Sequence, residues 1–472
     1  MSTAAVPQTE MQREAFSDDH LLFCGLDTDD ATKQRQQQPF VARPDPGTTF
    51  TISQDDLDGL YNFPDPFKGL RREHGRTIDL VDRKLPEEIF LDLLGSNKSP
   101  KPRYLAGVGG AGKSSIMLML AVLAMRHNKA LFAPASAPAP ASTSTSPLVA
   151  SAPGPARASF DGVIFLIYQP ATYSFVDDTA ELAAFGLIYE MQVNNRRFLQ
   201  SRMFDEPAFE VLKDAFVRRK TSSRDSEASL DQWGRIKAAL KSLESQSHRF
   251  RVLVLIDQWN AIIEANALPV GDRDKLEADH PAQDFSRLDA SFGCSLFVTA
   301  IGSSLSNGSV EVWCDAQAGD AKVTVQPLTP EEAETLRAIW YYRSPSLAVT
   351  REEMQRQFLD LGGVVHILQW YASSHFKNNF NSDLQDMYWS YYGCRLDRVR
   401  KRATSKRRLV EDLTAIFVHG QTLETLDDVW LETNMVKRDP DDPRRLIPVS
   451  PCTRRAALAV LNQMMTDPRF EV

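Results

Sequence analysis

A glycine-rich stretch at residues 107–114 (GVGGAGKS) constrains this chain more than any other part of the sequence. It matches the pattern G-x-x-x-x-G-K-[ST] at every fixed position. Glycines let the backbone curl so that several N–H groups converge on phosphate oxygens, where a side chain would block their approach. The ammonium of Lys113 can then reach the β- and γ-phosphates, and the hydroxyl of Ser114 can bind Mg²⁺.

The residues around this stretch have the order that a phosphate loop requires. A short extended run at residues 104–106 precedes it, and a strongly apolar helical run at residues 115–125 follows it. The N-terminal dipole of that helix favours a bound anion. The helix is apolar on all sides, so we expect it inside the protein, and it is shorter than the roughly 20 residues that span a bilayer. A glycine turn in a generic α/β protein is the alternative, but it gives no reason for a Lys-Ser pair at this register.

A second decisive element is the apolar run at residues 252–257 (VLVLID), which predicts a buried strand ending in Asp257. This position matches the carboxylate on the magnesium side of P-loop NTPases. It also lies at the carboxyl end of a strand, where ligands bind in open α/β sheets. We expect Ser114 and Asp257 to hold Mg²⁺, directly or through water. The alternative is a buried strand whose aspartate caps the next helix.

Polar residues after Asp257 are candidates for handling water. Gln258 or Asn260 is expected to orient the attacking water molecule. Many additional-strand ATPases place a glutamate where Gln258 stands. A glutamine can orient water by hydrogen bonds but cannot act as a general base, so we expect slow hydrolysis.

A further core strand is predicted at residues 295–301, followed by small polar residues. Thr299, Ser303 or Ser304 is expected to sense the γ-phosphate, with an ordinary strand end as the alternative. The catalytic candidates are Lys113, Asp257, Gln258, Asn260, Thr299 and Ser303. The residues expected to bind the nucleotide are Gly107, Gly109, Gly110, Ala111, Gly112, Lys113, Ser114 and Ser115.

Changes in composition divide the chain into three parts. Residues 1–47 are polar and rich in glutamine, which predicts a disordered N-terminal segment. Residues 48–328 hold the loop and the core strands, interrupted at 133–158 by a low-complexity insertion of Ala, Pro, Ser and Thr. Residues 329–472 form a C-terminal region. The predicted fold class is α/β: a P-loop NTPase core with a central parallel sheet, of the additional-strand, AAA-like type, plus a helical or winged-helix-like domain.

Other elements are predicted from periodicity and end signals. Thr329 begins a helix well, because proline follows at the first helical position and a glutamate stands three residues after the cap. The remaining predictions are helices at 85–94, 177–192, 230–243 and 351–361, strands at 163–168 and 322–325, and a hairpin within 435–449.

Charge and cysteine content exclude several classes of protein. The net charge is −8, so a nucleic-acid contact would need a local patch. The basic run at 395–408 could form one or target the nucleus, but a solvated helix face is the favoured interpretation. Five scattered cysteines without a C-x-x-C pair argue against a disulfide framework or a zinc site and favour a reducing compartment. No signal peptide or transmembrane stretch is visible, so no membrane contact is expected.

Four features together point to one family. They are the loop at 107–114, the run at 256–262 (IDQWNAI), the motif Gly362-Gly363-Val364 and the closing stretch at 433–452. The pattern resembles the P-loop ATPases of Crinkler effectors and of the related retrotransposon-hot-spot proteins, over roughly residues 100–465. The resemblance implies an AAA-like ATPase core with a C-terminal helical or winged-helix extension, ATP (or GTP) with Mg²⁺, and action in a host nucleus for some members.

The sequence departs from this family at several places. Residues 1–100 show no translocation-type domain, and His366 stands where related proteins carry an arginine that contacts the γ-phosphate. The mitochondrial ribosomal small-subunit GTPase of the death-associated type shares an Asp-x-x-Asn-Ala strand end and is the neighbouring alternative. Four acidic residues near the N-terminus argue against a mitochondrial presequence. No Asn-Lys-x-Asp signature is present, so the choice between ATP and GTP stays open.

Two functions from different classes follow. The first is a slow Mg²⁺-dependent ATPase that couples nucleotide state to a conformational change. The alternative is a binding module that does not hydrolyse the nucleotide and uses it to order the C-terminal region for a protein partner, a second copy or nucleic acid. The expected location is intracellular, in nucleus or cytoplasm, including a host cell if the protein is a translocated effector.

Overall fold

The computed structural model describes residues 44–57, 77–95, 103–132, 160–170, 249–257, 297–304, 321–343, 350–368, 406–420, 435–439 and 445–466, with single positions between 207 and 243 and at 430 and 442. Within these residues, five parallel strands form the central sheet, in the order β4-β5-β6-β3-β7. The strands are β3 (Arg103–Gly107), β4 (Val163–Pro170), β5 (Phe250–Asp257), β6 (Phe297–Ser304) and β7 (Lys322–Thr324).

The strand order places β6 between β3, which leads into the glycine loop, and β5, which ends at Asp257. A strand at this place is expected for the additional-strand class, and the predicted α/β core with a central parallel sheet is confirmed. β6 ends three residues later than predicted, because residues 302–304 continue the pairing with the last residues of β3.

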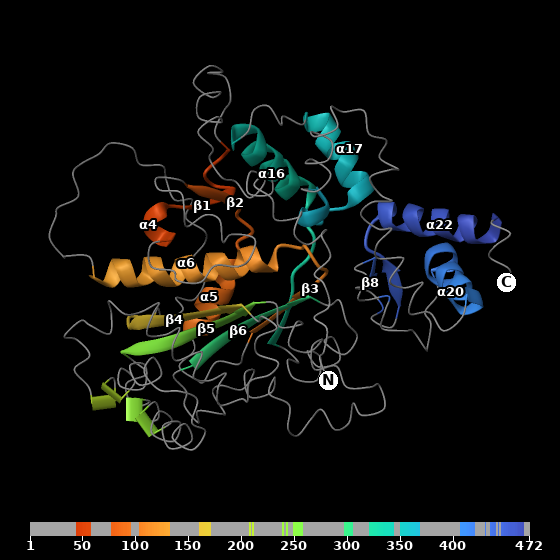
Figure 1. The fold of residues 1–472 in the computed structure, drawn as a ribbon. Coiled ribbons are helices and arrows are strands. Elements are labelled where there is room, and N and C mark those ends of the chain that lie inside the picture. Colours follow the sequence, from red (N-terminus) through yellow and green to blue (C-terminus); the bar gives the residue numbers. More distant parts are fainter. Residues whose placement is uncertain are drawn as a thin grey trace, which may run out of the picture.

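Burial explains why these runs form strands. Every residue of β5 is buried, as expected of a parallel strand covered on both faces. Helix α6 (Lys113–Phe132) crosses the sheet and packs on β4, β5 and β6 (Figure 1). Helix α5 (Leu85–Gly95) packs against α6 and β6. The apolar helix predicted after the loop therefore lies in the core, as expected.

Helix α6 extends seven residues beyond the predicted 115–125 at its C-terminal end, although its last turns are polar. Asn128 explains the extension, because its fully buried side chain donates to the carbonyl of Ile164 at 2.6 Å and accepts from the N–H of Ile164 at 2.8 Å. Both bonds replace those the amide would make with water. A polar residue thus continues the helix because β4 supplies its partners.

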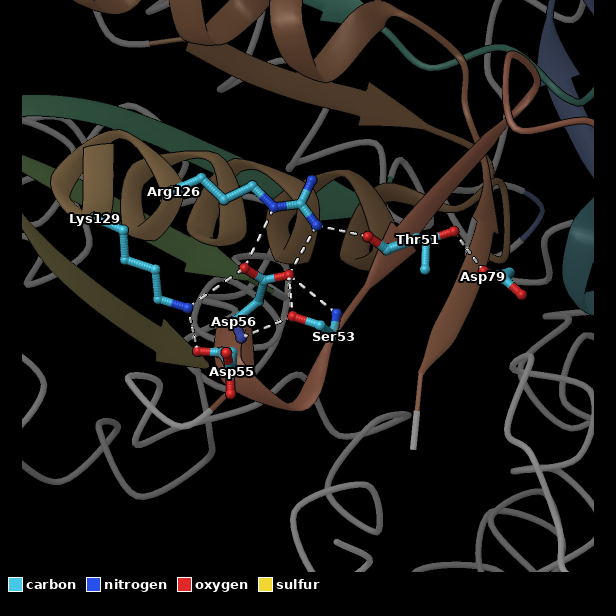
Figure 2. Close-up of polar contacts among 7 residues, drawn as sticks. All are labelled: Thr51, Ser53, Asp55, Asp56, Asp79, Arg126 and Lys129. Carbon is cyan, nitrogen blue, oxygen red and sulfur yellow. Dashed lines mark hydrogen bonds and ion pairs between the residues drawn. The ribbon is translucent and has the colours of Figure 1, made fainter. Parts of the chain in front are cut away.

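A short antiparallel pair, β1 (Thr49–Ile52) and β2 (Ile78–Val81), lies on the side of α6 away from the sheet (Figure 1). The one-turn helix α4 (Gln54–Leu57) follows β1 and carries Asp56, whose buried carboxylate receives Arg126 Nη2 at 2.8 Å and Ser53 N at 3.0 Å (Figure 2). Arg126 also donates to the carbonyl of Thr51. Lys129 Nζ lies 3.7 Å from Asp56 Oδ1 and completes this network, which holds residues 44–57 against α6.

The described part of the C-terminal region consists of helices and a hairpin. Its elements are α16 (Pro330–Arg343), α17 (Arg351–Leu361), α20 (Lys406–Leu413), the π-helix η8 (Thr414–His419), β8 (Val436–Arg438), β9 (Leu446–Pro448) and α22 (Pro451–Thr466). The predicted hairpin is confirmed as the antiparallel pair β8–β9. The capping box of α16 is also confirmed: Glu332 N donates to Thr329 Oγ1 at 3.2 Å, and Thr329 N donates to Glu332 Oε2 at 2.8 Å.

The buried apolar side chains of the described residues form two clusters. One fills the sheet, α5, α6 and the β1–β2 pair, and the other fills α16, α17, α20, η8, α22 and the hairpin. Val108 of the glycine loop packs against both clusters, so the loop lies at their junction. The predicted helices at 177–192 and most of 230–243, the insertion at 133–158, residues 1–43 and most of the basic run at 395–408 lie outside the described residues.

Candidate functional site

The glycine loop joins β3 to α6, so the predicted order of strand, loop and helix is confirmed. Gly110 and Gly112 have φ angles of +81° and +97°, a region that favours glycine. A Cβ on Gly110 would also stand 2.4 Å from the Cβ of His366. Inside the loop, the N–H of Ala111 donates to the carbonyl of Val108 at 3.2 Å. The loop therefore makes the tight turn that its sequence predicts.

Lys113 begins α6, and its side chain folds back under the loop. Its Nζ donates to the carbonyl of Gly107 at 3.0 Å and to that of Val108 at 2.8 Å. Burial lowers the pKa of the Lys113 ammonium to about 8, against the opposing effect of the nearby Asp257 carboxylate. A buried ammonium held by two carbonyls is positioned to exchange those partners for phosphate oxygens.

Asp257 ends β5. The negative charge of its carboxylate favours the protonated form of Lys113 and so offsets part of the effect of burial on the Lys113 pKa. Lys113 follows β3. This strand and β5 are far apart in the sequence, yet only β6 lies between them in the sheet. The hydroxyl of Tyr168 in β4, which pairs with Leu255 two residues before Asp257, donates to Asp257 Oδ2 at 3.1 Å. Tyr168 and Asp257 are 1 % and 3 % exposed, so this bond forms in a buried environment.

Gly302 of β6 has no side chain, and the Asp257 carboxylate occupies the space next to it. A Cβ at this position would stand 3.2 Å from Asp257 Oδ1 and 3.1 Å from Met117 Cε of α6. Both distances are tighter than ordinary van der Waals contact. The side chain that is absent from β6 therefore lets the carboxylate extend over the middle strand toward the helix that carries Lys113.

The other predicted site residues are placed as follows. Ser114 and Ser115 lie partly exposed in the first turn of α6. In β6, Ser303 pairs with Ala106 at the start of the glycine loop, whereas Thr299 pairs with Val254, three residues before Asp257. Ser303 and its neighbour Ser304 thus stand at the loop end of the sheet, and Thr299 stands deeper in it. Gln258 and Asn260 lie outside the described residues.

One contact of the loop comes from a residue that the sequence did not single out. Arg83, just after β2, donates from Nη1 to the carbonyl of Ala111 at 3.2 Å and from Nη2 to the carbonyl of Gln326 at 2.7 Å. Its Nε lies 3.3 Å from Glu332 Oε1. Arg83 stands between Asp82 and Lys84 in a polar stretch, so neither periodicity nor spacing indicates its contacts with the loop.

A second contact of the loop comes from the late Gly-Gly-Val motif. Gly362 ends α17 with φ of +71°, and its N–H donates to the carbonyl of Phe358. The carbonyl of Gly363 accepts the N–H of Leu328 at 2.7 Å, and the N–H of His366 donates to the carbonyl of Gly110 at 3.2 Å. The segment at 362–366 therefore connects α17 to the glycine loop through backbone bonds.

The side chains gathered here fit a magnesium-bound polyphosphate. Ser114 and Asp257 offer a hydroxyl and a carboxylate, which are the hard oxygen ligands that Mg²⁺ prefers. Lys113 and the N-terminus of α6 supply positive charge for the phosphates. Among the described residues, every helix is too short or too polar to cross a lipid bilayer.

Comparisons with known proteins find only loose structural likenesses. No family model matches the sequence, and no curated protein matches it. Among solved structures, a Walker-type ATPase of Pyrococcus abyssi is 13 % identical with a TM-score of 0.45, over 80 % of this chain and 95 % of that one.

Two further structures are more distant. The Orc1 protein of Aeropyrum pernix, solved in complex with DNA, is 12 % identical with a TM-score of 0.34, over 81 % of this chain and 91 % of that one. Cdc6p of Pyrobaculum aerophilum is 12 % identical with a TM-score of 0.28, over 80 % and 93 %. These likenesses are loose. The sheet order, the glycine loop and the buried residues Lys113 and Asp257 indicate the P-loop fold without them.

Proposed function

We propose that this chain is a P-loop protein that binds ATP with Mg²⁺ and hydrolyses it slowly. The observation that carries the proposal is the placement of two buried residues: Lys113 begins the helix that follows β3, Asp257 ends β5, and only β6 separates these two strands. A buried lysine whose pKa is lowered by burial, next to a charged partner at the edge of an α/β sheet, marks a candidate ligand site.

Each residue has a role in this proposal. Lys113 and the backbone N–H groups of residues 109–113 hold the phosphates, and Ser114 and Asp257 hold Mg²⁺. The metal would neutralise charge on the β- and γ-phosphate oxygens. The Tyr168 hydroxyl fixes one oxygen of Asp257, so that the carboxylate keeps one orientation toward the metal.

The sequence offers two pairs of candidates for the remaining roles. Gln258 or Asn260 orients the attacking water. Ser303 is the better candidate than Thr299 for contact with the γ-phosphate, because it pairs with Ala106 next to the loop, whereas Thr299 stands four residues further back. At about 3.3 Å per residue, this separation is on the order of 13 Å along the strand.

Nucleotide state is proposed to act on the C-terminal region through the bond from His366 N–H to the Gly110 carbonyl. A phosphate that tightens the loop moves an acceptor of this segment, and the segment continues from α17. The contact gives a short route from the site to the second apolar cluster.

Binding and turnover of the purified full chain test the proposal. We expect MgATP to bind, Lys113→Ala to abolish binding, and Asp257→Asn to remove the part of the affinity that depends on Mg²⁺. Phosphate release should be slow and lost in both variants. A wild-type protein that binds neither MgATP nor MgGTP at millimolar concentration would refute the proposal.

A second candidate function is a nucleotide-dependent binding module that does not hydrolyse ATP. The glutamine at position 258 favours it, since this side chain cannot act as a base. Nucleotide affinity without phosphate release identifies this module. Competition between ATP and GTP decides between the ATP-binding proposal and the GTPase alternative. The likeness to Crinkler ATPases stays a prediction from motifs, as does action in a host cell.

A further inference from the structure

Arg83 is held in place by a built turn. The N–H of Asp82 donates to the carbonyl of Thr48 at 2.9 Å, which fixes the chain just after β2. Asp82 Oδ1 then accepts the N–H of Lys84 at 3.0 Å, and its other oxygen pairs with Lys84 Nζ. Lys84 has φ of +58°, the one positive φ of a non-glycine residue among the residues described. Such a backbone persists only where its surroundings enforce it.

The turn directs the Arg83 side chain, which is 12 % exposed, onto three segments. Its guanidinium donates to the Ala111 carbonyl in the loop, to the Gln326 carbonyl after β7, and to Glu332 in the first turn of α16. Glu332 uses its other oxygen to cap that helix at Thr329. A planar fork with five donors can hold such a set, whereas an ammonium cannot match its geometry.

The Ala111 carbonyl belongs to the peptide that carries the N–H of Gly112. A trans peptide is planar, so its C=O and its N–H point in opposite directions. Holding the carbonyl on Arg83 therefore aims the Gly112 N–H to the opposite side of the chain. The preceding peptide is held in the same manner, since the Gly110 carbonyl accepts the N–H of His366.

We propose that Arg83 is a positioning residue of the phosphate loop: it fixes the outer, carbonyl side of the loop so that the Gly112 N–H faces the phosphates, and it ties the loop to the first turn of α16. The inference rests on the proposed function for its ligand. It adds a residue outside the G-x-x-x-x-G-K-[ST] pattern and links the β1–β2 pair to the site. Arg83 acts through the backbone of the loop and touches no reacting atom.

The test compares Arg83→Gln with a matched control, Arg251→Gln. Arg251 is also a buried arginine that donates to two carbonyls, those of Leu93 and Leu94, but it lies near the start of β5, at the end of the sheet away from Asp257. Both variants lose charge-assisted bonds to backbone carbonyls. A purely structural role would therefore affect the two proteins alike.

We expect Arg83→Gln to weaken MgATP binding by about tenfold, from the loss of a charge-assisted hydrogen bond that orients the loop. Arg83→Lys should recover part of the affinity, and Arg251→Gln should stay within about twofold of the wild type at a similar melting temperature. Nucleotide should slow amide exchange in residues 326–336 of the wild type and of Arg251→Gln, but not of Arg83→Gln.

Distinct outcomes separate this inference from the proposed function. If Arg83→Gln binds MgATP as tightly as the wild type does, the inference about Arg83 is wrong while the proposed function stands. The same holds if Arg251→Gln loses as much MgATP affinity as Arg83→Gln. If the wild type binds no nucleotide, the proposed function fails. Exchange in residues 107–116 of the free protein then decides, since unchanged exchange in Arg83→Gln overturns the positioning role. If Arg83→Gln does not fold, Glu332→Gln, which can keep the helix cap and loses the ion pair, must show the same loss of coupling to α16.

Discussion

Replacing Gly363 by alanine tests the contact between the C-terminal region and the glycine loop. A Cβ at this position would stand 2.0 Å from the carbonyl oxygen of Leu328, 2.7 Å from its nitrogen and 2.8 Å from its carbonyl carbon. All three atoms are backbone atoms, so no side-chain rotation can relieve the overlap. The segment must move by more than 1 Å to reach the 3.4 Å at which ordinary van der Waals contact begins, which breaks the bond from Leu328 N to Gly363 O.

The magnitude follows from two contributions. Overpacking costs about 1–3 kcal/mol, and the lost backbone bond costs about 1 kcal/mol more. We therefore expect Gly363→Ala to lower the free energy of unfolding by about 2–4 kcal/mol, a large share of the roughly 5–15 kcal/mol that domains have. Nucleotide affinity should fall as well, because residues 364–366 then leave the loop.

Urea unfolding monitored by tryptophan fluorescence measures this change, and Gly47→Ala is the control. A Cβ on Gly47, in an exposed turn, meets only the Asp45 carboxylate at 3.4 Å or beyond, so we expect a change below about 0.5 kcal/mol. If Gly363→Ala is as stable as Gly47→Ala, the segment at 362–366 does not pack against Leu328 as described. The proposed route from the loop to the C-terminal region then fails with it.

Three further predictions concern single side chains. Tyr168→Phe removes the hydroxyl from Asp257 and should weaken the Mg²⁺-dependent part of ATP affinity by about tenfold while affinity in EDTA stays unchanged; an equal loss in both titrations would refute the positioning of the carboxylate. Lys113, with its pKa lowered to about 8 by burial, must be protonated to hold phosphate, so calorimetry should show ATP affinity falling by up to about tenfold per pH unit above pH 8. A pH-independent affinity would contradict this role, and Lys113→Arg, if it binds, should remove the dependence. For Asp56, burial by itself raises the pKa, but the bonds from Arg126 and Ser53 outweigh it and hold the pKa below the ordinary 3.8. Its stabilising contribution is therefore present above that value and lost as the pH falls through the lower one, so Asp56→Asn should be less stable than the wild type at pH 7, with the difference shrinking below about pH 4. A difference that stays constant down to pH 2 would count against the network in Figure 2.

Much of the core could be predicted because its signals are local and strong. The buried runs at 163–168 and 252–257 are uninterrupted and apolar, and each became a strand with nearly the expected limits. The hydroxyl that caps α16 at Thr329 and the glycine with positive φ that ends α17 at Gly362 are both recognisable from the residue type alone. The loop pattern likewise fixes Lys113 and Ser114 at the start of a helix.

The contacts that complete the site could not be predicted, because they join segments far apart in sequence. β1 and β2 have only four residues each, which is too few for a clear alternation of apolar and polar residues. The segment that separates them in the sequence is also much longer than a tight hairpin turn. Arg83 reaches Gln326 and Glu332, which are more than 240 residues away. Tyr168 faces Asp257 only because β4 and β5 pair in one register. Such choices depend on tertiary packing.

The strand order also has a consequence for how the chain assembles. β3 is made early, but both of its neighbours in the sheet, β6 and β7, come roughly two hundred residues later. Until then the apolar surface of α6 has only part of its final cover, which is the condition under which nascent chains associate wrongly. A polypeptide cut before residue 297 should therefore be insoluble even though it contains the entire glycine loop, and synthesis of the native protein should depend on protection of that intermediate.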